Sequence, residues 1–390
     1  MPIMTDTHFL GYARASGNAG VRNHLLVLSV AGLTGPAARR VAQALPGARL
    51  VTMPYGGGLV GDDQALHMRA LAGLACNPNV GAVLLIGSDP PKLRTLAQAI
   101  AAHGTPLASV CLDDCEHDSL SLSDRAIRAG ARLHRDLSRQ RRVPVPVSQL
   151  FIGLECGRSD PSSGIVANPL IGRLTDAVVG QGGSAVFGET LEWLGAEHLL
   201  ARRAATPAVA EAVREAVLRR EALATRQGVD LLGNNPGPTN IAAGLSTIEE
   251  KSLGAIAKSG TAPIAGVLAY AQAPAAKGLY AMDAPAYSPE SLTGFVAAGA
   301  QLLLFSTGVG NSYVSLLAPT IKLSANPQAT QRLHEQLDFD ASAVLRGAGT
   351  PDDAARALLE LLVDVASGTL TWGEVLGEGD EVVSRLGEAL

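Results

Sequence analysis

Apolar and polar residues alternate along the chain in short blocks, and the spacing of the apolar positions switches repeatedly between two patterns. Short continuous apolar runs predict buried strands, and segments with apolar residues three or four apart predict helices. In the first part of the chain the predicted strands lie at 25–30, 49–53, 82–86 and 107–112, and the predicted helices at 36–45, 62–75 and 92–103. This order predicts an α/β fold, with helices covering parallel sheets in two or three subdomains.

The same order of elements returns after residue 148. Thr206 and Pro207 form a typical helix start, which predicts a long helix that Gly228 ends. Residues 246–249 read Ser-Thr-Ile-Glu, a capping box that predicts the start of the next helix. Further predicted elements are strands at 150–154 and 301–305 and helices at 169–179, 247–258 and 288–298. The second part is therefore expected to be an α/β unit as well.

A basic segment at 139–147 separates the two parts. Pro144 and Pro146 favour extended backbone there, which indicates a solvated linker, although a positively charged recognition patch is the alternative. In a chain of 390 residues this predicts an N-terminal α/β domain at 1–143 and a C-terminal α/β domain at 148–390. The second domain carries a possible subdivision near residue 230.

Composition restricts the class of protein. Hydrophobic residues make up 47% of the chain and charged residues 17%, which favours sizeable cores and a surface partly covered in a homo-oligomer. The net charge of −5 excludes a protein built to bind nucleic acid. We find no export signal, no membrane-spanning apolar run and too few cysteines for a disulfide scaffold. These features predict a cytoplasmic protein.

Three polar loops stand where ligands bind in parallel sheets, beyond the carboxyl ends of strands or ahead of a helix. The loops at 233–240 and 306–312 combine glycine with amides and hydroxyls, which suits an anion but also a simple turn. In the third loop Cys156 lies near Arg158, so it is either an activated thiolate or a small buried hydrophobe.

Two weaker patterns carry less chemistry. Residues 56–61 satisfy the G-x-G-x-x-G pattern, but Asp62 and Asp63 stand where a pyrophosphate would need positive charge, which argues against a nicotinamide site. Cys111, Cys115 and His117 lack typical metal-ligand spacing and are interpreted as structural.

Together the polar segments resemble the altronate/galactarate dehydratase family over nearly the whole chain. The family patterns are GYxRxDGRxGVRN, CGGSDxxSGxxANP, NPxPGNxxGGLTTxxEKSLG, MDTPG…TGxxAAGA and FTTGRG…PTIKxSSN. They are matched in this order within 11–23, 156–169, 235–254, 282–300 and 305–326. The resemblance implies the large catalytic portion of such an enzyme.

The resemblance implies a hydro-lyase, which removes water from a small 2-hydroxy acid or sugar acid by β-elimination. Sulfolactate sulfo-lyases are similar in their two-subunit layout, so release of sulfite by a carbon–sulfur lyase is the alternative. A ligand-binding pseudoenzyme is a third hypothesis. The resemblance also implies a small-molecule carboxylate substrate and a separate small subunit.

The resemblance and the chemical types of the side chains select the candidate site. Elimination needs a base for the α-proton, an electrophile for the enolate and assistance to the leaving group. Lys251 is predicted to be a base or enolate partner, with its pKa lowered by burial and by the helix N-terminus. The predicted catalytic residues are Cys156, Asp160, Glu250, Lys251 and Lys322, and the predicted substrate-binding residues are Arg22, Asn23, Asn235, Asn240, Asp283, Ser306, Thr307, Gly308 and Asn311.

Further expected roles concern the substrate carboxylate, acid–base catalysis and the lining of the pocket. Arg22 and Lys322 are expected to hold the carboxylate, and Asp160 and Glu250 to act as acids or bases. Residues 306–308, together with the helix beginning at Thr247, are expected to line the same pocket as Cys156.

The family also implies a divalent metal, iron, with Cys156 as the best single ligand. Gly57 and Pro90 stand where family members usually carry cysteines, so this chain would lack two of three expected ligands. Ile241 replaces a family lysine and Val309 replaces the arginine of the FTTGRG pattern. We therefore expect substoichiometric iron.

Overall fold

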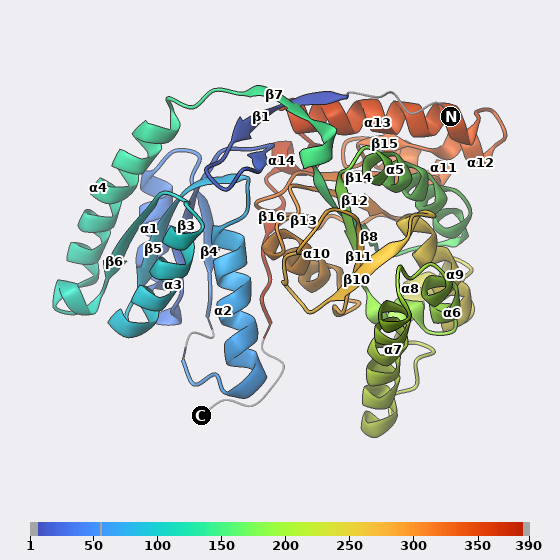
Figure 1. Ribbon diagram of the computed structural model, residues 1–390, viewed down its shortest axis with the longest axis horizontal. Coiled ribbons are helices and arrows are strands. Elements are labelled where there is room, and N and C mark those ends of the chain that lie inside the picture. Colours follow the sequence, from blue (N-terminus) through green and yellow to red (C-terminus); the bar gives the residue numbers. More distant parts are fainter. Residues whose placement is uncertain (1–6, 55–56, 385–390) are drawn as a thin grey trace.

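The computed structural model describes residues 7–54 and 57–384 and shows two parallel sheets, each covered by helices (Figure 1). The first sheet has the strand order β4-β3-β5-β6. Its elements are β3 (His24–Ser29), α1 (Gly35–Ala44), β4 (Arg49–Thr52), α2 (Gly61–Ala75), β5 (Val80–Gly87), α3 (Pro90–Ala102), β6 (Leu107–Cys111) and α4 (Ser119–Leu137). The predicted strand–helix order of this part is confirmed.

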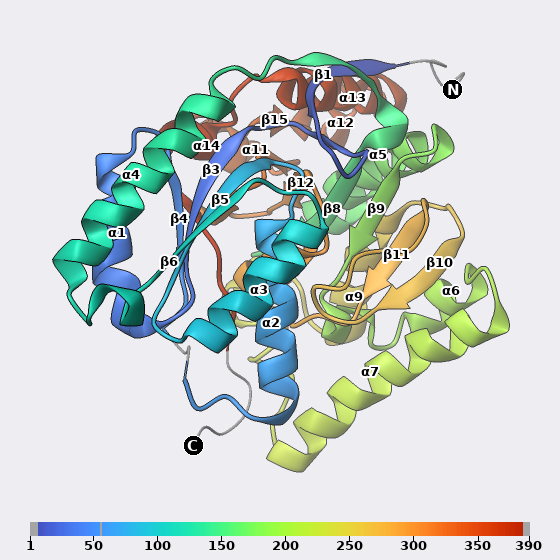
Figure 2. The ribbon, with the colours of Figure 1, turned by 60° about the vertical axis from the view of Figure 1, so that its left-hand side comes forward.

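Helices cover both faces of the first sheet, which explains why its central strands are apolar throughout. Leu25 and Val27 of β3 pack in one core with α1 and α4, whereas Leu26 and Leu28 pack in another with α2 and α3. Figure 2 shows α1 and α4 on one side of the strands and α2 and α3 on the other. Helix α4 was not predicted from the sequence. It begins Ser-Leu-Ser-Leu, an alternation that is more typical of a strand.

The second sheet has seven parallel strands in the order β10-β11-β9-β8-β12-β14-β15. Its strands are β8 (Phe151–Cys156), β9 (Ser184–Phe187), β10 (Ile264–Leu268), β11 (Leu279–Met282), β12 (Leu302–Ser306), β14 (Thr320–Ser324) and β15 (Phe339–Asp340). Its helices include α5 (Asn168–Gly180), α6 (Glu197–Arg202), α7 (Pro207–Gln227), α8 (Pro238–Ala242), α9 (Ile248–Ile256), α10 (Ser288–Ala297), α11 (Pro327–Arg332), α12 (Ser342–Leu345), α13 (Pro351–Ser367) and α14 (Trp372–Leu376). The predicted α/β class is confirmed for this part too.

The two sheets share a core through α2 and α10. Leu71 of α2 and Phe295 of α10 belong to one buried cluster that reaches both sheets. The helices approach so closely that a Cβ on Gly73 would lie 2.1 Å from the carbonyl oxygen of Ala297. The predicted boundary between 143 and 148 stays a prediction.

Residues 143–146 of the segment predicted to be a solvated linker instead form a strand of a sheet. Strand β7 (Val143–Pro146) pairs antiparallel with β1 (His8–Ala13), which also pairs with β2 (Ala19–Gly20). Arg142 donates to the carbonyls of Leu10 and Val21, and its guanidinium lies 4.8 Å from the Tyr12 ring centroid. The prolines do keep this backbone extended, but its basic side chains satisfy carbonyl groups of the fold.

Small differences concern helix starts and the remaining short strands. Thr247, not Ser246, caps α9, because its hydroxyl accepts the Glu250 N–H while Glu250 accepts the Ser246 N–H.

β13 (Val314–Ser315) pairs with β16 (Gly379–Asp380) in a separate ladder. Tyr55 and Gly56 of the glycine-rich segment lie outside the described residues. Within the described ranges, no helix is both long and apolar enough to cross a membrane.

Candidate functional site

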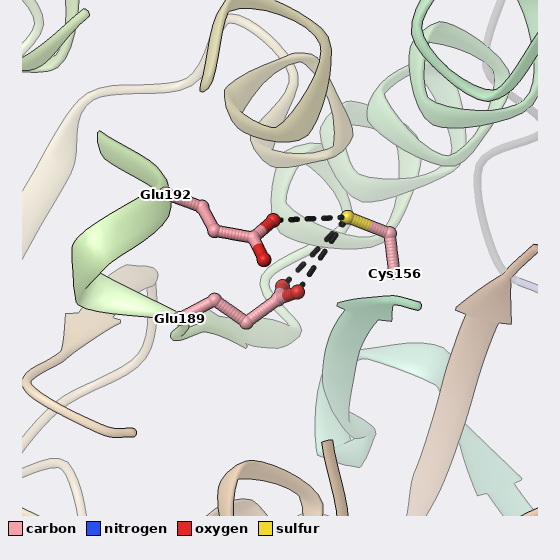
Figure 3. A group of neighbouring side chains, drawn as sticks. All are labelled: Cys156, Glu189 and Glu192. Atoms are coloured by element: carbon pink, nitrogen blue, oxygen red, sulfur yellow. Dashed lines mark hydrogen bonds between the residues drawn. The ribbon is translucent and has the colours of Figure 1, made fainter. Parts of the chain in front are cut away.

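A group of buried ionisable side chains lies at the carboxyl ends of β8 and β9. Cys156 is the last residue of β8, and Glu189 and Glu192 follow β9 after one and four further residues. Figure 3 shows both carboxylates turned toward the Cys156 sulfur. Sγ lies 3.6 Å from Oε1 of Glu189 and 3.9 Å from Oε2 of Glu192. The three groups thus meet at one point of the sheet edge.

The turn that carries the two glutamates is fixed by apolar packing. Glu189 adopts a left-handed conformation with φ of 62°, which reverses the chain directly after the strand. Trp193 donates from its indole nitrogen to the Gly188 carbonyl at 2.9 Å, and its ring packs on Phe187 with centroids 5.4 Å apart. The carboxylates are therefore held on a rigid turn.

Two lysines reach the glutamates from α9 and the turn that follows it. Lys251 Nζ lies 2.7 Å from Glu192 Oε1 and 2.6 Å from Asn235 Oδ1, and Asn235 Nδ2 donates to the same Glu192 oxygen at 3.1 Å. Lys258 Nζ pairs with Glu189 and lies 3.2 Å from the Cys156 sulfur. Each glutamate therefore has its own ammonium partner.

A cavity of about 610 Å³ opens onto one side of this group. Cys156, Glu192 and Lys251 form its inner wall. The outer walls come from the β8 turn, the α10 start, the loop after β12 and the C-terminal segment, and they include Arg158, Tyr287, Ser288, Asn311, Ser312, Tyr313 and Glu378. Its size is ordinary for a small-molecule site, and Glu189 and Lys258 lie behind the wall.

Burial dominates the electrostatics of the inner groups. It raises the pKa of Glu189 to about 7, although the Lys258 charge opposes the change. Burial and then the charge of Glu189 raise the pKa of the Cys156 thiol, so the sulfur keeps its proton at neutral pH. Burial acts to lower the pKa of Lys258, but its interactions with Cys156, Glu189 and Glu192 together raise it.

A third acid, Glu155, lies one residue before Cys156 and is fully buried. One of its oxygens accepts the Ser291 hydroxyl at 2.8 Å, and the other has no hydrogen-bond partner among the described residues. Burial first, and the charge of Glu189 second, raise its pKa well above the usual range. Two lysines thus pair with two glutamates, whereas Glu155 has no cationic partner in the described part of the chain and its burial disfavours ionisation.

The expectation that the pKa of Lys251 falls is wrong. Burial alone would lower it, but the charge and hydrogen bond of Glu192 outweigh burial, so the pKa is raised. The helix start does lie one turn away, yet a carboxylate at 2.7 Å acts more strongly than a partial helix charge. Lys251 is therefore an ammonium group, suited to stabilise negative charge and not to take a proton.

Three predicted residues line the cavity, Cys156, Lys251 and Asn311, and a fourth, Asn235, bonds to Lys251 in its wall. A fifth, Lys322, is buried behind the wall and donates to Glu378 at 3.1 Å and to the Ser312 carbonyl at 3.4 Å. A charge in an apolar strand does meet an anion here, but that anion is the protein's own carboxylate.

A second set of predicted residues forms a structural layer beside the cavity. Asp160 accepts hydrogen bonds from Ser162, Ser163 and Asn326, so its carboxylate is fully occupied. A Cβ on Gly308 would lie 2.3 Å from the Asp160 carboxyl carbon, which explains the glycine. The remaining members bond within the fold: Asn240 to the Ser159 carbonyl, Ser306 to Asn168, and Thr307 to the Gly310 N–H.

The expected shared pocket is therefore found only in part. Ser306 is the register partner of Cys156 in the neighbouring strand, so the two loops are adjacent. Asp160, Lys251 and Glu250 border a separate hollow of about 250 Å³. Of the 306–312 loop, Asn311 and Ser312 line the larger cavity, whereas 306–308 do not appear among its walls.

Four predicted residues lie away from the cavity. Arg22 forms a bidentate pair with Glu374 at 2.6 and 2.8 Å, and Asn23 bonds to Arg14. Asp283 pairs with Arg219 and Arg220, and the exposed Glu250 caps α9. These contacts give each of the four a structural partner.

Glu189, Glu192 and Lys258 are not among the residues predicted for the site. Two signals pointed to them. Lys251 and Lys258 are seven residues apart, which places both on one face of a helix, and two acids follow a short buried strand directly. The acids after β9 and the lysines of α9 and the following turn meet only through the tertiary arrangement of the strands, which local sequence patterns do not show.

Cys156, Glu189 and Glu192 form the one group in the described ranges whose ligand atoms lie close enough for a metal ion, within 4.8 Å of one another. The arrangement does not suit iron as it stands. Both carboxylates already pair with ammonium groups, and the thiol keeps its proton, whereas a metal binds the thiolate. Cys111 and Cys115 are free thiols that lie outside this group.

Comparison with known proteins confirms the resemblance drawn from the motifs. Residues 147–389 match the family described as D-galactarate/altronate dehydratase, C-terminal, and residues 11–138 match the second domain of D-galactarate dehydratase/altronate hydrolase. A (2R)-sulfolactate sulfo-lyase subunit beta from Chromohalobacter salexigens is 38% identical over 98% of each chain. An altronate dehydratase from Escherichia coli is 32% identical over 93% of this chain and 74% of its own.

Proposed function

Because the chain belongs to the D-galactarate/altronate dehydratase family, we propose that it is a lyase that catalyses β-elimination from a small 2-hydroxy acid. One observation carries the proposal. The Lys251–Glu192 pair, with its 2.7 Å contact, lies in the wall of a cavity of about 610 Å³. A carboxylate and an ammonium side by side supply the base and the electrophile that elimination needs.

In this mechanism Glu192 takes the proton from C2, the carbon next to the substrate carboxylate. The electron pair of that bond forms the C2–C3 double bond, and the leaving group departs from C3 with its own bonding pair. The enol product then loses its hydroxyl proton and gains a proton at C3, which gives a 2-oxo acid.

Lys251 contributes most when the proton has moved. Before the transfer its charge is balanced by ionised Glu192, and afterwards Glu192 is neutral. The ammonium charge is then available to the negative charge that develops on the substrate. An interaction that strengthens in the transition state accelerates the reaction, whereas uniform binding does not.

The leaving group distinguishes two candidate reactions. Departing water needs a proton, which the Cys156 thiol at the cavity wall can give, and Glu189 behind it, with its pKa raised to about 7, can return a proton to the sulfur. Departing sulfite is a stable anion and needs none. The match to the sulfo-lyase β subunit over 98% of both chains favours sulfite release and a separate partner subunit.

The lysine-paired carboxylates favour elimination by the protein's own groups, Glu192 and Lys251, and not by the iron that the family implies. Lys322 is still proposed to bind the substrate carboxylate, which would have to replace Glu378 as its ion-pair partner. Arg22, Asn23, Asp283 and Glu250 then have structural roles.

The test is turnover of 3-sulfolactate, altronate and galactarate by the purified chain, alone and with a small subunit encoded beside it. We expect 2-oxo acid formation from at least one of them and its loss in Lys251→Met. Lys277→Met, which changes a lysine at a different cavity, is the matched control. Binding of these acids without turnover under every condition would contradict the lyase and favour a ligand-binding protein.

A further inference from the structure

Arg158 occupies a backbone position that suits glycine. It is the second residue after β8, its φ is 54°, and its side chain is exposed. Residues with a side chain rarely adopt this left-handed region, because the Cβ approaches the following carbonyl oxygen. Strain of this kind persists where the surrounding structure enforces it and the side chain has a use.

The surrounding turn fixes Arg158 firmly. Its carbonyl accepts the N–H groups of Gly308 and Val309 at 3.2 and 3.3 Å. Just before it, a Cβ on Gly157 would lie 2.8 Å from the Ser288 hydroxyl, so the backbone is closely packed there. The turn therefore fixes the backbone of Arg158 at the cavity that Cys156 and Lys251 also line.

Arg158 differs from Lys251 in the cavity wall and from Lys322 behind it. Lys251 pairs with Glu192, and Lys322 pairs with Glu378. Arg158 forms no ion pair with any carboxylate among the residues described, which leaves its charge available to a ligand. A guanidinium offers a planar fork of donors that matches a carboxylate or sulfonate.

We propose that Arg158 is a specificity-determining residue that binds a second anionic group, so that the preferred substrate is a dianion with a carboxylate at one end and a carboxylate or sulfonate at the other. This inference rests on the proposed function. The sequence agrees: the family pattern CGGSD has glycine at this position, and the FTTGRG arginine is Val309, whose N–H bonds to Arg158. The positive charge is thus moved to the neighbouring loop.

The test compares two ligands with the same three-carbon skeleton, the dianion 3-sulfolactate and the monoanion glycerate. Dissociation constants are measured by calorimetry for the wild type, Arg158→Gln and Arg158→Gly. We expect both variants to bind 3-sulfolactate about 10- to 100-fold more weakly, the value of a charged hydrogen-bonding group. Glycerate binding should change less than about twofold. Arg139→Gln, at an exposed arginine, is the control.

Thermal unfolding separates this role from a structural one. Glycine fits the left-handed backbone, so Arg158→Gly should unfold at the same temperature as the wild type or higher. Equal loss of both ligands, or no loss of 3-sulfolactate binding, would overturn the inference while leaving the lyase intact. Arg158-dependent binding of 3-sulfolactate by a wild type that turns over no acid would overturn the lyase and support the assigned ligand class.

Discussion

The two parallel sheets of this protein follow the same architectural rule and use their carboxyl ends differently. At the first sheet, Asp89 and Asp118 follow strands β5 and β6 and cap the next helices, accepting the N–H groups of Lys92 and of Leu120 and Ser121. At the second, Glu189 and Glu192 follow β9 and pair with buried lysines at a cavity wall. The fold thus fixes where acids gather, and burial beside a cation marks the acids that we expect to do chemistry.

The largest expected effect separates these two kinds of acid. Glu192→Gln removes the proposed base without changing its size, so kcat should fall roughly 10³-fold. Asp89→Ala removes a cap and should leave kcat within about twofold while lowering the free energy of unfolding by about 1 kcal/mol. Steady-state kinetics and urea denaturation measure the two. A Glu192→Gln variant with normal kcat would show that the acids of the second sheet are structural as well.

The sequence predicted the fold class and most elements because apolar runs and helix caps are local signals. The same locality explains the errors. The strand β7 pairs with β1 across more than a hundred residues, so its pairing left no trace in its own composition. Glu189 and Lys258 meet only because β8, β9 and α9 converge. Family motifs did indicate Cys156 and Lys251, which line the cavity, and Asn235, which bonds to Lys251.

The second prediction concerns the cost of breaking a buried pair. Lys258→Met leaves Glu189 fully buried without its partner, which should lower the free energy of unfolding by about 3–5 kcal/mol. Adding Glu189→Gln to this variant removes the charge and should restore a large part of that loss. Urea denaturation at pH 7.5 measures both. If the double variant is less stable than the single one, the pair is held by packing and not by charge balance.

The third prediction concerns pH and uses a buried acid outside the site. Glu381, in the C-terminal segment, accepts hydrogen bonds from Thr293 and Ser315, and burial raises its pKa to about 7. Since the folded pKa exceeds the ordinary value of 4.5, the folded state binds the proton more tightly. Its contribution is full below pH 4.5 and is lost as the pH rises to about 7, a change on the order of a few kcal/mol.

Glu381→Gln cannot ionise, so its stability should fall less steeply across that window than the stability of the wild type. Glu189 keeps part of the slope, because its pKa is also raised to about 7. Unfolding free energies at pH 5, 6 and 7 give the two slopes. Identical slopes would mean that Glu381 is ionised in the folded state throughout.

The smallest expected effect concerns metal. If Lys251 and Lys258 neutralise the two carboxylates, iron has no vacant anionic site, and anaerobically purified protein should carry clearly less than one iron per chain. It should show no iron–sulfur absorbance, because Gly57 and Pro90 replace two family cysteines. Treatment with a chelator, followed by its removal, should change kcat less than about twofold.

In Lys258→Met the freed Glu189 and Cys156 resemble a metal site more closely, so metal analysis of that variant should find more iron than in the wild type. Full iron occupancy in the wild type, with activity lost on chelation, would instead make the second sheet's acids metal ligands and the lysines their partners only in the metal-free protein.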